Sequence, residues 1–285
     1  MNILGLWYIN LIIAWFCSVL RTQCFKVATK TAKDDGALTI LLQLISGALI
    51  LIWVPFFDIR FPTDPRVYFF VGLAVLFFAL NNRLSTTIMR GIEASTFSIL
   101  KQTNVIFMII IGLTFFGEPA VPTAIIGAIL IIFSNFLVFY KKGDLKMSKY
   151  VALGVLSNLS LALAVTLDIR ISGYFNLPFY MMITFSAPAL VIFLFERTKI
   201  STLKEEFKNV NKKILILIGL SWSVGAIAIL RAYLLGNVTV VAPLSSISVM
   251  LNVLAGYIFL KERENLLKKI IAGVLIIISV FLIQM

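Results

Sequence analysis

The chain has 285 residues, of which 60% are hydrophobic and 13% are charged, and its formal net charge is +12. A soluble domain carries roughly 25% charged residues, so this composition excludes a water-soluble globular protein and predicts an integral membrane protein. The sequence has no histidine and two cysteines, Cys17 and Cys24. These counts exclude a disulfide framework and a histidine-based metal or acid–base site, and we expect no cofactor and no metal.

Ten apolar runs follow one another along the chain, each close to the roughly 20 residues that a helix needs to cross a bilayer. They cover residues 3–23, 36–57, 67–89, 94–116, 120–140, 150–169, 175–195, 214–235, 239–260 and 266–284. A turn at Gly236-Asn237 separates the eighth run from the ninth. The pattern predicts an all-α integral membrane protein with ten transmembrane helices. Only the connection 197–213 is long enough for an extra helix, which we expect to cap the membrane surface.

Lysine and arginine gather in alternate loops. The odd-numbered loops hold 19 of them, whereas the even-numbered loops and the termini hold only Arg60, Arg66 and Arg170. Because cytoplasmic loops are rich in Lys and Arg, the odd loops are predicted to be cytoplasmic and both termini external, in a multi-pass protein of the cell membrane. The positive charge therefore indicates topology and contact with anionic lipid headgroups, and we expect no nucleic-acid partner.

The chain repeats itself with a period of about 145 residues. In residues 100–139 and again in 241–283, a helix with scattered polar residues ends at Gly117-Glu118 or Lys261-Glu262, and an apolar helix with an early glycine follows. We predict two five-helix repeats, 1–140 and 150–285, joined by a linker at 141–149. Since five is an odd number, the second repeat enters the membrane inverted, and inverted repeats enclose a central cavity that supports alternating access.

These motifs resemble the drug/metabolite transporter superfamily, specifically its ten-helix EamA-type members. The resemblance is strongest in "GEPAVPTAIIGAIL" (117–130) and "GNVTVVAPLSSISVMLNVLAGYIFLKE" (236–262). It covers nearly the whole chain and implies a transporter with ten helices around a central cavity. Members carry amino acids, sugars, nucleotides or cationic drugs, so the resemblance does not name a substrate. The family is usually drawn with cytoplasmic termini, which differs from the charge pattern, and both orientations stay open.

The repeated glutamates, Glu118 and Glu262, each come shortly before a new helix. A carboxylate there is favoured by the free N–H groups and the dipole of the helix that follows. We therefore expect a structural role for both.

Three basic residues fall inside predicted spans and away from their ends: Arg83, Lys101 and Arg231. Intramembrane charge is costly and marks functional sites. Lys101 lies about 10 Å into the bilayer at 1.5 Å per residue, and it begins a polar patch that continues with Gln102 and Asn104.

Lys101 also precedes Glu118 by 17 residues. This spacing is similar to that of the helix-four lysine of the plastid sugar-phosphate translocators, distant relatives in the superfamily, where it meets the substrate's phosphate. We predict that Lys101 contacts an anionic group of the substrate. The alternatives are that it extends to the cytoplasmic interface or pairs with Glu93.

Further candidate substrate-binding residues are aromatic or polar side chains at membrane depth, for which core packing is the alternative. With the residues above, the predicted set is Trp15, Ser18, Asn82, Arg83, Lys101, Gln102, Asn104, Asn158, Trp222, Arg231, Ser245 and Ser246. For Arg231, snorkelling to the surface is the alternative. Two acids, Asp168 and Glu93, lie near the ends of predicted helices, and no carboxylate occupies the middle of a span. Proton-driven export of drug cations needs a membrane-buried acid, so it is disfavoured.

The sequence therefore predicts a secondary transporter of a small polar metabolite, anionic or zwitterionic, such as an amino acid. The alternatives are a sugar-phosphate or nucleotide-sugar exchanger, a lipid-linked-sugar flippase, or a membrane subunit without transport activity. An enzyme is disfavoured, since the chain has no histidine and its 13 acids are scattered over loops. The expected partners are a small-molecule substrate and the lipid bilayer, with the protein a monomer or a homodimer.

Overall fold

The computed structural model describes residues 6–58, 60–115, 122–139, 149–236, 241 and 244–284. Within these ranges every regular element is a helix, and none of the described residues forms a strand. Three predictions lie outside the described residues: the role of Glu118, the turn at Asn237 and nearly all of the linker 141–149.

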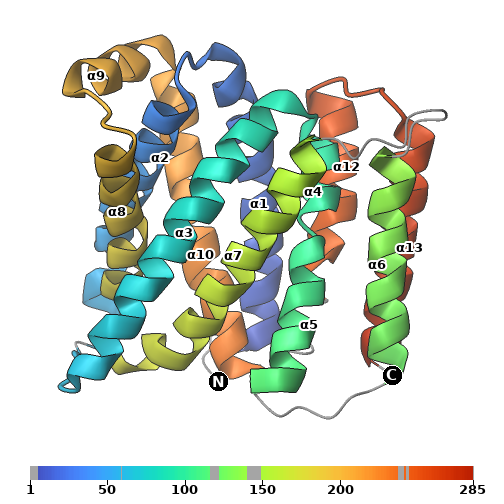
Figure 1. The fold of residues 1–285 in the computed structure, drawn as a ribbon, viewed down its shortest axis with the longest axis horizontal. Coiled ribbons are helices and arrows are strands. Elements are labelled where there is room, and N and C mark those ends of the chain that lie inside the picture. Colours follow the sequence, from blue (N-terminus) through green and yellow to red (C-terminus); the bar gives the residue numbers. More distant parts are fainter. Residues whose placement is uncertain are drawn as a thin grey trace.

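The first part of the chain forms α1 (Trp7–Thr31), α2 (Asp35–Ile50) with a 3-10 continuation η2 (Leu51–Phe56), α3 (Pro65–Gly91), α4 (Ala94–Leu100), α5 (Thr103–Phe115) and α6 (Pro122–Phe139). The second part forms α7 (Lys149–Ile171), η3 (Ser172–Tyr174), α8 (Leu177–Phe195), α9 (Ile200–Asn209), α10 (Lys212–Leu235), α12 (Ile247–Phe259) and α13 (Leu266–Gln284). Figure 1 shows them as one bundle of long helices with the short α9 across one end.

Seven segments among the described residues are long and apolar enough to cross a membrane. They are Trp7–Thr31, Asp35–Phe56, Pro65–Gly91, Ala94–Phe115, Lys149–Tyr174, Leu177–Phe195 and Lys212–Leu235. Large apolar side chains such as Phe16 and Phe69 are exposed on the outside of the bundle, as contact with lipid tails requires. An all-α membrane protein is therefore confirmed, while the number of ten crossings stays a prediction.

Polar side chains set where several helices begin. Asp34 accepts a hydrogen bond from the N–H of Ala37 at 2.7 Å and starts α2, and Asn176 accepts one from the N–H of Phe179 at 3.0 Å and starts α8. Each satisfies an N–H group that has no partner within its own helix. Asp64 caps α3 in the same way.

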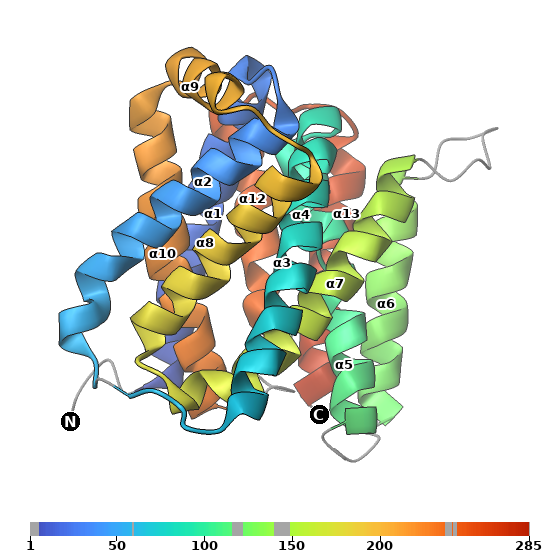
Figure 2. The same cartoon turned by 60° about the vertical axis from the view of Figure 1, so that its left-hand side comes forward.

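The connections divide between the two ends of the bundle. Those between α1 and α2, α3 and α4, α8 and α10, and α12 and α13 lie at the end that carries α9, and both termini point to the opposite end (Figures 1 and 2). The Lys- and Arg-rich loops that the structure describes are therefore on one side, as predicted. Which side faces the cytoplasm stays a prediction.

Helices from the two parts of the chain interleave. The most extensive contacts join α1 to α10, α3 to α7, α2 to α8, and α6 to α13. The interior of the bundle is therefore built jointly by the two parts of the chain.

Glu262 corrects one expectation about helix capping. Its carboxylate accepts hydrogen bonds from the N–H of Ala94 at 2.7 Å, the N–H of Ser95 at 3.0 Å and the hydroxyl of Ser95 at 2.5 Å. It therefore caps α4, in the other part of the chain, and not the helix that follows it. The physical reason is that the N–H of Glu262 bonds to Gly256 O at the end of α12, four residues before α13 begins at Leu266.

Candidate substrate cavity

A cavity of about 300 Å³ lies inside the bundle. Its wall is formed by α1, α2, α3, α4, α5, α7, α8, α10 and α12, together with the turn between α4 and α5. A volume of this size suits a small molecule. The polar residues of the wall include Ser18, Arg21, Thr22, Asn81, Asn82, Ser85, Lys101, Gln102, Asn104, Asp168, Ser248 and Asn252.

The helix that carries Lys101 is interrupted at that residue. Between α4 and α5, the N–H of Gln102 bonds to Ile99 O and the N–H of Asn104 bonds to Lys101 O, both at 3.0 Å and both in the tighter 3-10 spacing. The side-chain amide of Asn158 on α7 donates to Leu100 O at 3.0 Å and so satisfies a carbonyl at the end of α4. The interruption is thus stabilised from α7, and Lys101 and Gln102 line the cavity from it.

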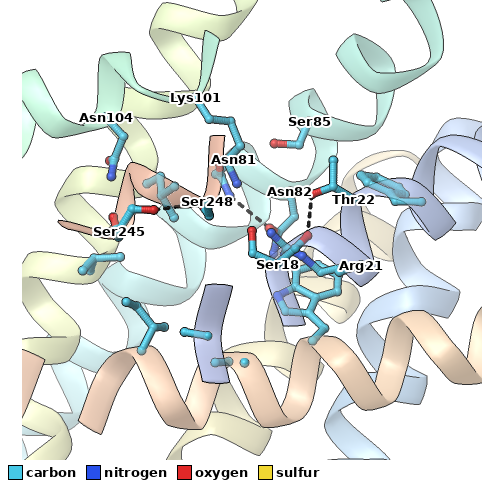
Figure 3. A pocket seen from close by; sticks show the side chains of 18 of the residues that line it. Ser18, Arg21, Thr22, Asn81, Asn82, Ser85, Lys101, Asn104, Ser245 and Ser248 are labelled. Carbon is cyan, nitrogen blue, oxygen red and sulfur yellow. Dashed lines mark hydrogen bonds between the residues drawn. The ribbon is translucent and has the colours of Figure 1, made fainter. Parts of the chain in front are cut away.

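Two cations line the cavity without an acidic partner. Lys101 Nζ lies 5.5 Å from the centre of the Phe97 ring, and Arg21 Cζ on α1 lies 5.0 Å from the centre of the Trp222 ring. None of the salt bridges among the described residues includes either cation. Figure 3 shows both side chains at one polar region of the pocket. This region is therefore positively charged.

The alternative partner of Lys101 is occupied. Glu93 forms an ion pair with Lys269 of α13, whose side chain is almost completely buried. The structure thus disagrees with a Lys101–Glu93 pair.

Amide and hydroxyl groups surround the two cations. On α3, Asn81 donates to Asn82 Oδ1 at 3.0 Å and accepts from the Ser157 hydroxyl at 3.0 Å, so these amides are held in fixed orientations (Figure 3). In contrast, Gln102 Oε1 and Asn104 Oδ1 are buried and accept no hydrogen bond from the described residues. Buried polar atoms are normally paired, so both oxygens are available to a donor group of a solute or to water.

One carboxylate also lines the cavity. Asp168 on α7 is 3% exposed, and the phenol of Tyr180 on α8 donates a hydrogen bond to it. It lies three residues before the end of α7, as expected, but its burial and its place in the cavity wall were not expected.

The comparisons with known proteins give a family for the first half of the chain. A model of the EamA-like transporter family matches residues 5–140. Residues 5–140 belong to the EamA-like transporter family. This family is part of the drug/metabolite transporter superfamily, so the predicted membership is confirmed. No curated protein matches the chain.

Solved structures support the fold of the whole chain. In total, 24 chains of solved structures match it. One crystal structure, described only as that of a protein, superposes with a TM-score of 0.59 at 13% sequence identity, covering 97% of this chain and 98% of that one. At this identity the likeness shows the fold alone.

The predicted site residues divide between the cavity and other positions. Those that line the cavity are Trp15, Ser18, Asn82, Lys101, Gln102, Asn104, Trp222 and Ser245. Those that do not line it are Arg83, Asn158, Arg231 and Ser246. The aromatic rings of Trp15 and Trp222 thus share one cavity with the polar patch around Lys101.

The four that lie elsewhere contact or are buried among other parts of the bundle. Arg83 follows Asn82 by one residue and so points about 100° away from it, where it pairs with Glu196 at 2.5 Å. Arg231 lies 5.3 Å from the centre of the Phe57 ring. Asn158 bonds to α4, as described above, and Ser246 is completely buried beside the start of α12.

Sequence reasoning missed Arg21, Asp168 and several polar residues of the wall, among them Thr22, Asn81, Ser85, Ser248 and Asn252. Arg21 was counted with the first loop because it lies only two residues before the predicted end of the first span at residue 23, whereas α1 continues to Thr31. One signal was present: Arg21 follows Ser18 by three residues, and residues three apart lie on the same face of a helix.

Proposed function

We propose that this protein is a secondary transporter that moves a small anionic or zwitterionic metabolite across the cell membrane by alternating access. The observation that carries the proposal is the pair of cations, Arg21 and Lys101, which line one cavity without an acidic partner among the described residues. A desolvated charge without a counter-ion is costly. A carboxylate or phosphate of a solute offsets this cost, because it forms charge-assisted hydrogen bonds with both groups.

The remainder of the cavity favours a solute that also has hydrogen-bond donors. The free oxygens of Gln102 and Asn104 accept from an ammonium or hydroxyl group. The rings of Trp15 and Trp222 provide apolar contact area. An amino acid combines the three features that this cavity favours, which are an anionic group, a hydrogen-bond donor and an apolar surface. A sugar phosphate, the second candidate, combines a dianion with hydroxyl groups.

We further propose that the chain crosses the membrane ten times as two inverted repeats, 1–140 and 150–285. The helix interruption at Lys101 and the turn at Ser246 before α12 are 145 residues apart, which is the period of the repeat. Under this relation α1 corresponds to α7 and α3 to α10, so the α1–α10 contact corresponds to the α3–α7 contact. Broken helices at the interface of inverted repeats are where transporters bind their solutes, and this supports the cavity as the binding site.

Counterflow in proteoliposomes tests the proposed function. Purified protein is reconstituted in vesicles loaded with an unlabelled solute mixture of L-amino acids and four-carbon dicarboxylates, and uptake of the same solutes in radiolabelled form is measured. Labelled uptake above that of protein-free vesicles is expected. Trans-stimulation only by sugar phosphates or nucleotide sugars would favour the exchanger. Stimulation by none of these anions or zwitterions would contradict the proposal.

A matched control is available for the cations. Arg231 is also an arginine of an apolar helix, but it does not line the cavity. Arg231→Gln should retain counterflow, whereas Arg21→Gln should lose most of it. Equal losses in both variants would show that Arg21 has no special role in solute binding.

A further inference from the structure

Asp168 is an acidic side chain in an unusual position. It lies in an apolar helix long enough to cross a membrane, it is 3% exposed, and it lines the cavity. Among the described residues of the cavity wall it is the sole carboxylate, because every other lining residue is neutral or basic. Ionisable groups at such places are costly and typically have a function.

The surroundings of Asp168 provide a hydrogen bond but no counter-ion in contact with it. On α8, the fully buried Tyr180 donates its phenol to the carboxylate. On α10, Tyr233 lines the same cavity, and Arg231 lies over the Phe57 ring. On α7 itself, the nearest charge along the chain is Arg170, which is exposed.

The remaining charges of the cavity are the two cations, Arg21 on α1 and Lys101 between α4 and α5. Neither forms a salt bridge with Asp168, and none of the ion pairs among the described residues includes this carboxylate. No basic side chain among the described residues therefore pairs with this carboxylate, and a proton is the smallest species that neutralises its charge.

We propose that Asp168 is a proton-binding site of the cavity and that one proton is transported together with the anionic solute. The proton comes from water on one side of the membrane, binds a carboxylate oxygen of Asp168 and leaves to water on the other side. No other bond forms or breaks. This inference rests on the proposed function and specifies its energy source.

The charges of the cavity determine the direction of the coupling. With the carboxylate ionised, the wall carries two positive charges and one negative charge; with it protonated, only the positive charges remain. Proton binding therefore strengthens the attraction for an anion, and by linkage a bound anion strengthens the binding of the proton. The two ligands enter the cavity together, which is proton symport and not antiport.

The first experiment needs no substrate. Infrared difference spectra of the purified protein, recorded as the pH is raised, report the carbonyl stretch of a protonated carboxyl group. We expect a band that disappears with rising pH in the parent protein and is missing from Asp168→Asn. A band that is the same in both, or that does not change with pH, would contradict a proton-binding Asp168.

The second experiment tests coupling. Proteoliposomes take up the radiolabelled solute mixture of L-amino acids and four-carbon dicarboxylates with and without an acidic outside medium. A gradient of one pH unit corresponds to up to about tenfold accumulation per proton. We expect the parent protein to accumulate solute in the gradient and Asp168→Asn to lose this accumulation. Asp58→Asn, which changes an exposed carboxylate, is the matched control and should behave like the parent.

The outcomes separate this inference from the proposed function. Counterflow that a pH gradient does not affect would overturn proton coupling and leave the transporter intact. No counterflow in the parent would overturn the proposed function, while the infrared titration still tests the proton site. Loss of counterflow in Asp168→Asn with unchanged thermal unfolding would assign the carboxylate to solute binding and contradict the inference.

If Asp168→Asn does not fold, Tyr180→Phe gives the same information. This variant keeps the carboxylate but removes the hydrogen bond that favours its charged form. Both the infrared titration and the gradient-driven uptake should then have their midpoint at higher pH. Unchanged midpoints would overturn the inference.

Discussion

Replacing Lys101 by alanine should reduce transport while leaving the protein as stable as before, or more stable. The Lys101 ammonium forms no salt bridge with any residue that the structure describes, and it lies 5.5 Å from the centre of the Phe97 ring. Such a cation–ring contact stabilises by about 0.5–2 kcal/mol. Its loss is offset because the variant no longer desolvates an unpaired cation, which costs several kcal/mol.

The loss of transport follows from the missing contact with the solute. A hydrogen bond to a charged group contributes about 1.5–3 kcal/mol, and each 1.4 kcal/mol is a factor of about ten in affinity. Counterflow of an anionic solute should therefore weaken by about ten- to a hundredfold. Lys101→Arg should retain part of the activity, because the charge is kept while the geometry changes.

The assay compares Ala, Gln and Arg variants of Lys101 at matched amounts of reconstituted protein, together with thermal unfolding in detergent. Arg231→Gln is the control for removal of a cation outside the cavity. If Lys101→Gln transports as well as the parent, Lys101 does not bind the solute. If Lys101→Ala instead unfolds at a clearly lower temperature, the reasoning about an unpaired buried cation is wrong.

Three other predictions concern the second cation, the cap of α4 and the topology. The double variant Arg21→Ala/Lys101→Ala should lose less counterflow activity than the product of the two single fold-losses, because both cations line one cavity. If the two fold-losses multiply fully, the two cations do not bind the same solute molecule. Glu262→Ala should lower the free energy of unfolding by about 2 kcal/mol, because the N–H groups of α4 lose their acceptor, and an unchanged denaturation midpoint would contradict this. A cysteine at position 144 should resist an impermeant thiol reagent in intact cells, in a variant that also has Cys17 and Cys24 replaced; rapid labelling would place both termini in the cytoplasm.

The sequence predicted much of the fold because lipid imposes a simple constraint on it. Apolar runs of sufficient length coincide with the long helices, and the alternating loop charges coincide with the two ends of the bundle. Lys101 could be selected because a polar patch in an apolar run must face protein or water. None of this needed knowledge of how the helices pack.

What the sequence could not provide is where a helix ends inside the protein and which way each side chain points. Lys26, counted as a loop residue, lies within α1 and donates to Met89 O at 2.7 Å and Ile92 O at 2.5 Å. A helix inside the bundle can thus contain a lysine or arginine at which the search for apolar runs ends the predicted span. Arg21 was missed for the same reason. Similarly, Asn82 and Arg83 are neighbours in the sequence, but only Asn82 lines the cavity.

The two halves of the chain contribute unequally to the cavity, and this difference bears on what it binds. At the corresponding interruptions, the half that belongs to the EamA-like family has Lys101, and the other half has the uncharged Ser246. Both cations of the wall, Arg21 and Lys101, come from residues 5–140, whereas its carboxylate, Asp168, comes from the second half. A symmetric pair of repeats would place equal charges on both sides of the solute. If the cavity binds an anionic solute and a proton as proposed, these charges attract the anionic end of the solute to the first half and the proton to the second, and they favour binding in a single orientation.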